Sequence, residues 1–74
     1  MTRAQSNVLK EIKSFWNDNG YSPSFVELQI KLGYKSLSGV HKHCMQLVKR
    51  GYITHMPDAQ RSIELTQKGT SYVA

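Results

Sequence analysis

The chain has 74 residues, enough for one domain with a small hydrophobic core and no room for an enclosed active site. Its function is therefore expected on its surface. Ten Lys and Arg against five Asp and Glu give a net charge of +5. This balance favours nucleic acid, an anionic membrane or an acidic protein as the partner.

Several classes of protein are disfavoured by the same composition. Cys44 is the only cysteine and cannot form a disulfide within the chain. The first ten residues lack the apolar run of a signal peptide, and no segment approaches the stretch of about 20 apolar residues that a membrane span requires. We therefore expect a cytoplasmic, nucleoid-associated protein with no membrane partner.

The first expected helix covers about residues 3–18. Thr2 and Gln5 have the spacing of a capping box, which begins a helix. Apolar residues then recur at helical spacing, namely Val8, Ile12, Phe15 and Trp16. Gly20 can adopt the left-handed conformation that ends a helix.

A second, short helix is expected at about residues 25–32, after the extended segment that Pro23 imposes. Ser24 and Glu27 form another capping box, and Gly33 ends the helix. A helix of two to three turns is too short to be stable alone, so it needs packing against the rest of the domain.

A third helix, at about residues 37–50, follows a short turn, and Ser36 is its expected cap. Its apolar stripe, expected to be buried, consists of Leu37, Val40, Cys44, Leu47 and Val48. A short helix, a tight turn and a longer amphipathic helix together form a helix-turn-helix pattern.

After Gly51 the periodicity changes from that of a helix to that of strands. Two alternating segments separated by a turn predict a β-hairpin at about residues 52–66, with Gln60 and Arg61 at its tip. Thr66 begins a tail that could form one capped helical turn or fray. We therefore expect a single domain, residues 1–74, mainly α with a small β-hairpin (α+β): a three-helix winged helix-turn-helix domain.

The outward face of the third helix is the candidate site, because it is cationic and carries no acidic residue. Small residues at its start would let the helix approach base edges, and longer donors one turn later could reach bases or phosphates. The base-reading candidates are Ser38, Gly39, His41, Lys42 and Gln46. Such a face can also be merely solvated; the tight turn before it and the wing after it favour DNA.

A second set of residues could contact the DNA backbone. Its members are Ser36, Lys35, Lys49, Gln60, Arg61 and Arg3, with Lys10 as a further candidate. Arg61 is expected at a phosphate or in the minor groove. For Ser36, capping of the helix is an equal alternative to DNA contact. For Arg3, Lys10 and Lys35, an equal alternative is that the charge only keeps the protein soluble.

No enzymatic or metal-dependent chemistry is expected. His41 and His43 lie two residues apart on different helix faces, and Cys44 belongs to the stripe expected to be buried. The acidic residues are scattered, and neither a nucleophile elbow nor a phosphate-binding loop is present. We therefore predict no catalytic residue, no metal, no cofactor and no small-molecule ligand.

The sequence from Thr2 to Leu65 resembles the N-terminal DNA-binding domain of the LexA repressors. The residues that carry the resemblance are Gly20-Tyr21-Ser22-Pro23-Ser24, Glu27-Leu28, Lys31-Leu32-Gly33-Tyr34-Lys35-Ser36, His43, Leu47, Lys49-Arg50-Gly51 and Ile53. The later stretch from Arg61 to Gly69 is similar to the exit from the wing in many winged-helix regulators.

This resemblance implies a winged domain whose third helix enters the major groove. It places the base readers near the start of that helix, on Ser36, Ser38, Gly39, His41 and Lys42. Members of the family carry acidic residues where this chain has His41 and Lys42, and a proline where it has Leu37. The family's operator sequence is therefore not carried over.

The same repressors continue into a domain that dimerises and cuts itself with a serine–lysine dyad, and this chain contains neither the dyad nor the cleavage site. Two alternatives follow: an excised DNA-binding domain, or a free-standing small regulator of a phage or other mobile element.

The leading hypothesis is a sequence-specific regulator of transcription, a repressor, that binds double-stranded DNA. Two copies on paired half-sites would raise its affinity. A weak homodimer contact could come from Ile30, Met45, Met56 or the Tyr72-Val73 tail. The alternative is a winged-helix protein-interaction module, an adaptor or anti-repressor; RNA binding is disfavoured because most aromatic residues are expected to be buried.

Overall fold

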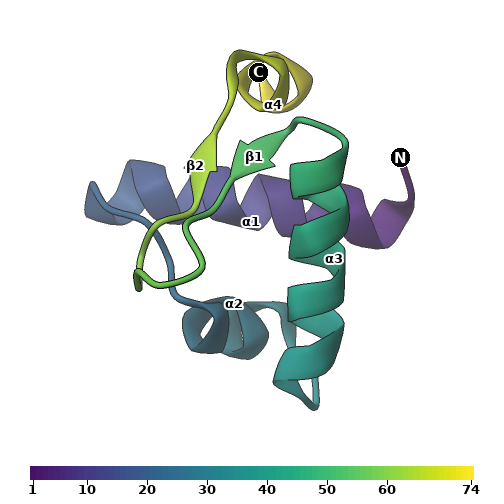
Figure 1. Ribbon diagram of the computed structural model, residues 1–74, viewed down its shortest axis with the longest axis vertical. Helices are drawn as coiled ribbons and strands as arrows, with labels where there is room; N and C mark the ends of the chain where they lie inside the picture. The colour runs from purple at the N-terminus through teal and green to yellow at the C-terminus, as the bar shows by residue number, and fades with distance from the viewer.

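In a computed structural model that describes residues 1–74, four helices surround a two-stranded hairpin (Figure 1). The elements are α1 (Arg3–Asn19), α2 (Phe25–Leu32), α3 (Leu37–Lys49), β1 (Ile53–Thr54), β2 (Glu64–Leu65) and α4 (Gln67–Val73). Helices α1, α2 and α3 all contact one another, and α4 packs on α1 and β2. The expected fold class, mainly α with a small hairpin, is confirmed.

Both predicted capping boxes are present. Thr2 Oγ1 accepts a hydrogen bond from Gln5 N at 3.1 Å, and Gln5 Oε1 accepts one from Thr2 N at 3.3 Å. Ser24 and Glu27 exchange the corresponding bonds at the start of α2. These bonds satisfy backbone N–H groups that a helix start leaves free, so both helices begin at the residues expected.

Ser36 occupies the cap position of α3, but the prediction that it caps the helix is wrong with respect to its side chain. Its hydroxyl makes no capping bond and instead lies 2.9 Å from the Ser38 hydroxyl. The first N–H groups of α3 are thus left without a side-chain acceptor.

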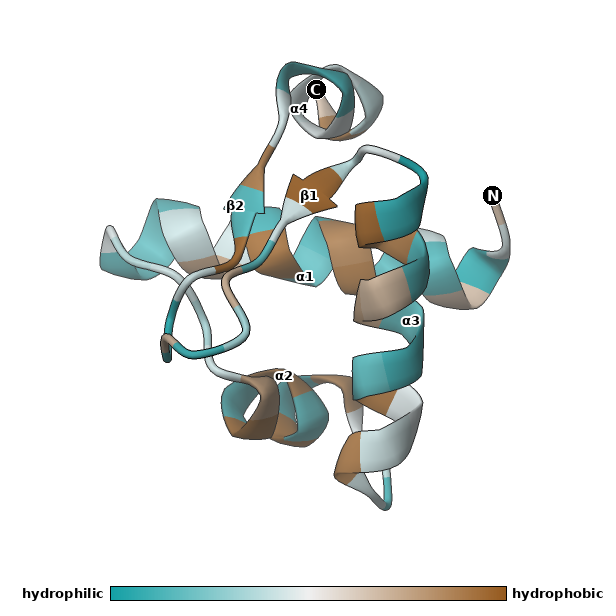
Figure 2. Ribbon diagram, in the orientation of Figure 1, coloured by the Kyte–Doolittle hydropathy of each residue, from teal (hydrophilic) through white to brown (hydrophobic).

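The core lies where α1, α2, α3 and the hairpin meet, and Figure 2 shows the apolar segments of these elements turned toward one another. Its fully buried members are Val8, Leu9, Ile12, Leu28, Val40, Cys44, Leu47, Ile53 and Ile63. Two residues of the expected α3 stripe are not fully buried. Val48 is only partly buried, and Leu37, which was predicted to be core, is 43% exposed. Leu37 begins α3 at the end that projects past α1 (Figure 1), so α1 does not cover it.

The hairpin has a ladder of only two residues per strand, with Ile53 opposite Leu65 and Thr54 opposite Glu64. Hydrogen bonds beyond the ladder attach it to the rest of the domain. Trp16 Nε1 donates to Ile63 O at 2.9 Å, and Ile63 N donates to the buried Ser22 hydroxyl at 3.0 Å. We call the segment from Ile53 to Leu65 the wing; its position depends on these attachments more than on its own pairing.

The tail forms a helix, α4, and Thr66 caps it by accepting a hydrogen bond from Gly69 N at 3.1 Å. Gly69 is buried and lies directly on the backbone of Tyr52, where a Cβ would overlap the Tyr52 carbonyl oxygen. Glycine is therefore the residue that allows α4 to dock this closely. No helix of the domain is both long enough and apolar enough to cross a bilayer.

Candidate nucleic-acid interface

Three of the predicted base readers lie together on the outer face of α3. Ser38, His41 and Lys42 are all exposed, at positions i, i+3 and i+4, and they line the same open hollow. Lys49 is exposed two turns further along the helix, and Lys35 is exposed in the turn before it. The exposed face of α3 thus presents hydroxyl, imidazole and ammonium groups within about one helical turn.

The structure places the other two predicted base readers elsewhere. A Cβ on Gly39 would lie 3.3 Å from the ring of Tyr34, so this residue faces the turn between α2 and α3. Gln46 is half-buried, and its Oε1 accepts a hydrogen bond from Gln5 Nε2 at 2.6 Å. Both residues help to pack α3 against its neighbours and are not gathered with the exposed three.

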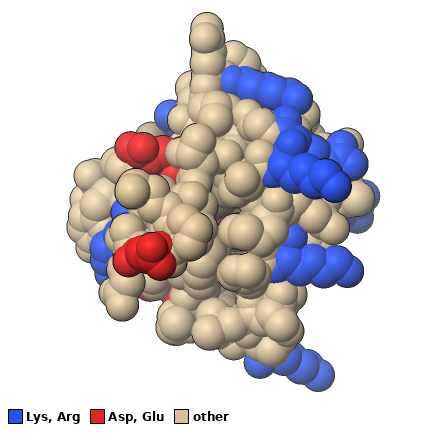
Figure 3. Space-filling view, viewed as in Figure 1, with Lys and Arg blue, Asp and Glu red and all other residues tan.

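Lysine and arginine side chains gather along the side of the molecule on which α3 lies (Figure 3). The acidic side chains visible in the same view lie on the opposite side, over the wing. Arg3 is exposed in the first turn of α1, and the hydrogen bond between Gln5 and Gln46 holds that turn beside the second half of α3. The outer face of α3 and the start of α1 therefore belong to one cationic side.

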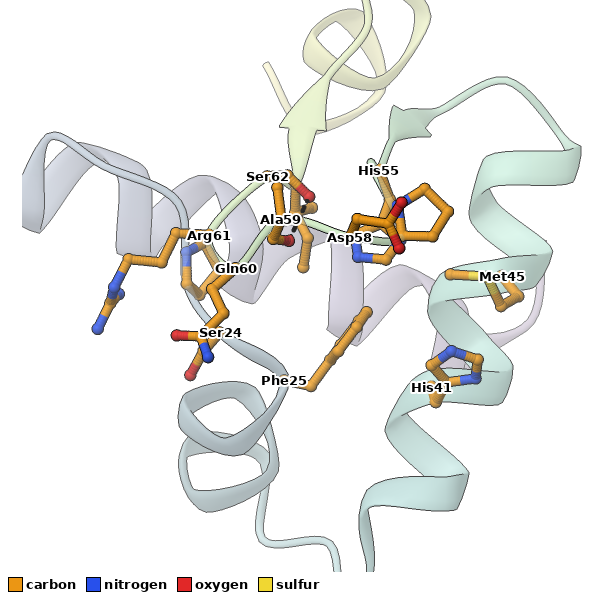
Figure 4. A pocket seen from close by; sticks show the side chains of 13 residues that line it. Ser24, Phe25, His41, Met45, His55, Asp58, Ala59, Gln60, Arg61 and Ser62 are labelled. Carbon is orange, nitrogen blue, oxygen red and sulfur yellow. Dashed lines mark hydrogen bonds between the residues drawn. The ribbon is translucent and has the colours of Figure 1, made fainter.

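A second hollow of about 340 Å³ separates α3 from the wing (Figure 4). Phe25 lines it and packs edge to face against two imidazoles, with ring centroids 5.3 Å from His41 and 5.0 Å from His55. The exposed Gln60 lies on its wing side. The hollow separates the helix and wing surfaces that the sequence predicted to contact a duplex.

Arg61 does not extend freely from the tip of the wing. Its guanidinium donates to both carboxylate oxygens of Glu27, at 2.6 and 3.0 Å, and to Ser22 O at 3.0 Å. It also lies 4.8 Å from the centroid of the Tyr21 ring. Sequence reasoning missed this arrangement, because Glu27 and Arg61 are 34 residues apart and Glu27 already had a role in the capping box.

The ion pair changes the electrostatics of Glu27. The hydrogen bond from Arg61, with a smaller contribution from the Ser24 backbone N–H, lowers the pKa of Glu27 from 4.5 to about 2. The backbone of Arg61 has a φ of 54°, in the left-handed region that residues other than glycine seldom adopt. The contacts of its side chain compensate for this conformation.

Cys44 lies fully inside the core, and burial raises the pKa of its thiol to about 12. A protonated, inaccessible thiol is neither a nucleophile nor a metal ligand. No three His, Cys, Asp or Glu side chains come together in a geometry that could hold a metal ion.

The residues proposed for a homodimer contact divide into two groups. Ile30 and Met56 are 73% and 66% exposed, as that proposal requires. Met45 and Val73, however, are partly buried and pack against the core, so the expectation that they are free on the surface is wrong. Tyr72 is about half exposed, with its ring 5.7 Å from that of Tyr52.

Two helices joined by a tight turn, a supporting first helix and a hairpin after the second helix of the pair define a winged helix-turn-helix domain. The family described as the LexA DNA binding domain matches residues 1–62 of this chain. The chain therefore belongs to the LexA DNA-binding domain family.

Individual relatives agree with this assignment. The LexA repressor of Syntrophobacter fumaroxidans is 37% identical over 75 residues, which cover 100% of this chain and 36% of the repressor. That of Novosphingobium aromaticivorans is 38% identical over 73 residues, covering 99% of this chain and 31% of the relative. The LexA repressor of Cellvibrio japonicus is 37% identical over 67 residues, covering 90% of this chain and 34% of the relative. The chain thus spans about a third of the length of these relatives.

Proposed function

We propose that this chain binds double-stranded DNA sequence-specifically, as the DNA-binding part of a repressor of transcription. The observation that carries the proposal is the exposed cluster of Ser38, His41 and Lys42 near the start of α3, on the cationic side of a LexA-family domain. In this arrangement α3 enters the major groove, and the wing lies along the adjacent backbone or minor groove.

The start of α3 is suited to a phosphate. Because Ser36 makes no capping bond, the first N–H groups of the helix are free to donate to an anion. The hydroxyls of Ser36 and Ser38 are hydrogen-bonded to each other, so one of the two can donate as well. Lys42, one turn further, can donate to guanine O6 and N7 or neutralise a phosphate, and Lys35 and Lys49 supply backbone contacts on either side. Arg3 would contact the backbone from α1.

The wing contributes through Gln60, whose side chain is exposed. Arg61 uses three of its five guanidinium N–H donors on Glu27 and Ser22, which leaves Nε–H and one Nη2–H for a phosphate. Arg61 can therefore contact the DNA backbone while it stays paired with Glu27.

Two copies acting on paired half-sites in the nucleoid would multiply the few base contacts that one such domain makes. A domain with this role needs neither catalysis nor a cofactor. An adaptor role without DNA predicts binding that survives high salt, and the cationic α3 face does not favour it.

The first test is fluorescence anisotropy with a random-sequence duplex over a series of salt concentrations. We expect micromolar or weaker binding with a steep negative salt slope. Lys42→Ala should weaken binding and reduce the magnitude of the slope by about 1, the effect of losing one phosphate contact. The control is Lys13→Ala, which removes a cation beside Trp16 and Glu64, outside the proposed interface.

Equal losses for Lys42→Ala and Lys13→Ala would show that only overall charge matters and would contradict a docked α3. Absence of binding at low salt, by protein whose circular dichroism shows it to be folded, would overturn the proposal.

A further inference from the structure

Leu37 is an apolar side chain in the middle of a polar surface. It begins α3, is 43% exposed, and is followed directly by the exposed Ser38. Exposed leucines are common on protein surfaces, so exposure alone has no meaning. The position of Leu37 is informative, because its neighbours on the surface are the residues proposed to face the bases.

The Leu37 side chain borders an open hollow of about 390 Å³. This hollow differs from the one beside the wing, because Leu37, Ser38 and Lys42 line only this one. Phe25 and Leu37 form its apolar part, and Ser38, His41 and Lys42 form its polar part. The Phe25 ring comes from α2 toward α3 and lies edge to face with His41 (Figure 4), at a centroid distance of 5.3 Å. An apolar patch is thus held next to three polar groups, of which two can always donate a hydrogen bond.

Each base pair presents a different set of groups in the major groove. Thymine presents a methyl group beside the O4 acceptor, guanine presents two acceptors, adenine an acceptor and a donor, and cytosine a donor. Of the four bases, only thymine combines an apolar group with a neighbouring acceptor. Leu37 and Phe25 match the methyl group, and Ser38 or Lys42 matches O4.

We infer that Leu37, with Phe25 beside it, forms a site for the 5-methyl group of a thymine in the operator. The inference rests on the proposed function and adds to it the identity of one base and the residue that reads it.

The test begins with selection of bound duplexes from a random pool, which gives the operator. Each thymine of the operator is then replaced in turn by deoxyuridine, which lacks only the methyl group. At one position in each half-site we expect affinity to fall about three- to fivefold, the ratio expected for one methyl group removed from water. Leu37→Ala should abolish the difference between thymine and deoxyuridine at that position.

The matched control is Val26→Ala, which truncates an exposed apolar residue of α2 that does not line the hollow. This variant should keep the full thymine preference. Both substituted side chains are exposed, and thermal unfolding followed by circular dichroism will verify that both variants are folded.

Two results would overturn the inference: no position sensitive to deoxyuridine, or an equal sensitivity in Leu37→Ala. If either occurs while random duplex is still bound with a steep salt slope, DNA binding stands and only the methyl site is lost. Absence of all duplex binding would remove both.

Discussion

Arg61 connects the wing to residues 21–27, a segment that is distant from it in the chain. From the wing, it contacts the carboxylate of Glu27 at the start of α2, the Ser22 carbonyl and the Tyr21 ring. Both side chains of the ion pair remain partly exposed, at 41% and 32%, so solvent screens the pair and limits its contribution to stability. Its structural value is to fix where the wing leaves the helices.

The lowered pKa of Glu27 gives this ion pair a pH dependence with a definite sign. The ordinary pKa is 4.5 and that in the folded protein about 2, so the folded state favours the ionised form. The stabilisation is complete above pH 4.5 and is lost as the pH falls toward 2. Glu27→Gln retains a capping-box side chain but not the charge. We expect its Tm to be below that of the wild type near neutral pH, with the difference disappearing toward pH 2.

Thermal unfolding over this pH range measures that difference. Glu64→Gln, in an exposed residue that forms no ion pair, is the control and should show no such trend. A difference between wild type and Glu27→Gln that is the same at every pH would mean that the charge of Glu27 contributes nothing.

At the scale of single elements, α4 depends on one glycine. Gly69 lies inside a helix, where replacement of an exposed glycine by alanine normally stabilises by about 1 kcal/mol. Here a Cβ would overlap the Tyr52 carbonyl oxygen, and a backbone atom cannot rotate away. We expect Gly69→Ala to destabilise the domain by roughly 1–3 kcal/mol, the usual cost of overpacking.

Urea unfolding of Gly69→Ala measures this change, with Ser71→Ala, in an exposed residue of the same helix, as the control. A stabilised Gly69→Ala variant would show that α4 does not dock on Tyr52 as described.

Local signals predicted the elements, and long-range contacts account for what the sequence did not reveal. The capping boxes of Thr2 and Ser24 need residues only three positions apart, so the sequence shows them directly. The bond between Gln5 and Gln46 joins residues 41 apart, and nothing local distinguishes Gln46 from a free surface donor. Leu37 fits the periodicity of a buried stripe, yet periodicity does not reveal that α1 ends its contact with α3 before reaching it.

At the scale of the whole molecule, a single hydrophobic core joins α1, α2 and α3 to the wing. Its buried cluster takes residues from α1, α2, α3, β1 and the strand approach at Ile63. Since α1 contributes three of these residues and also holds the wing through Trp16, the wing should not detach before the helices unfold.

This prediction can be measured because Trp16 is the only tryptophan. Its indole donates to Ile63 O, so its fluorescence reports on the attachment of the wing, whereas far-ultraviolet circular dichroism reports on the helices. We expect the two signals to give the same urea midpoint and slope, as in a two-state transition. A fluorescence midpoint at lower urea would mean that the wing unfolds separately.

The loop at the end of the wing closes on itself. The Ser62 hydroxyl accepts a hydrogen bond from Met56 N and lies within hydrogen-bonding distance of the carbonyl oxygens of Met56 and Ala59, and residues 57–60 between these ends are exposed. A closed loop can change in length or sequence without transmitting strain to the strands that support it. In evolution, this tip could acquire new DNA preferences while the core and α3 stay unchanged, and in the laboratory it is the segment to exchange between relatives.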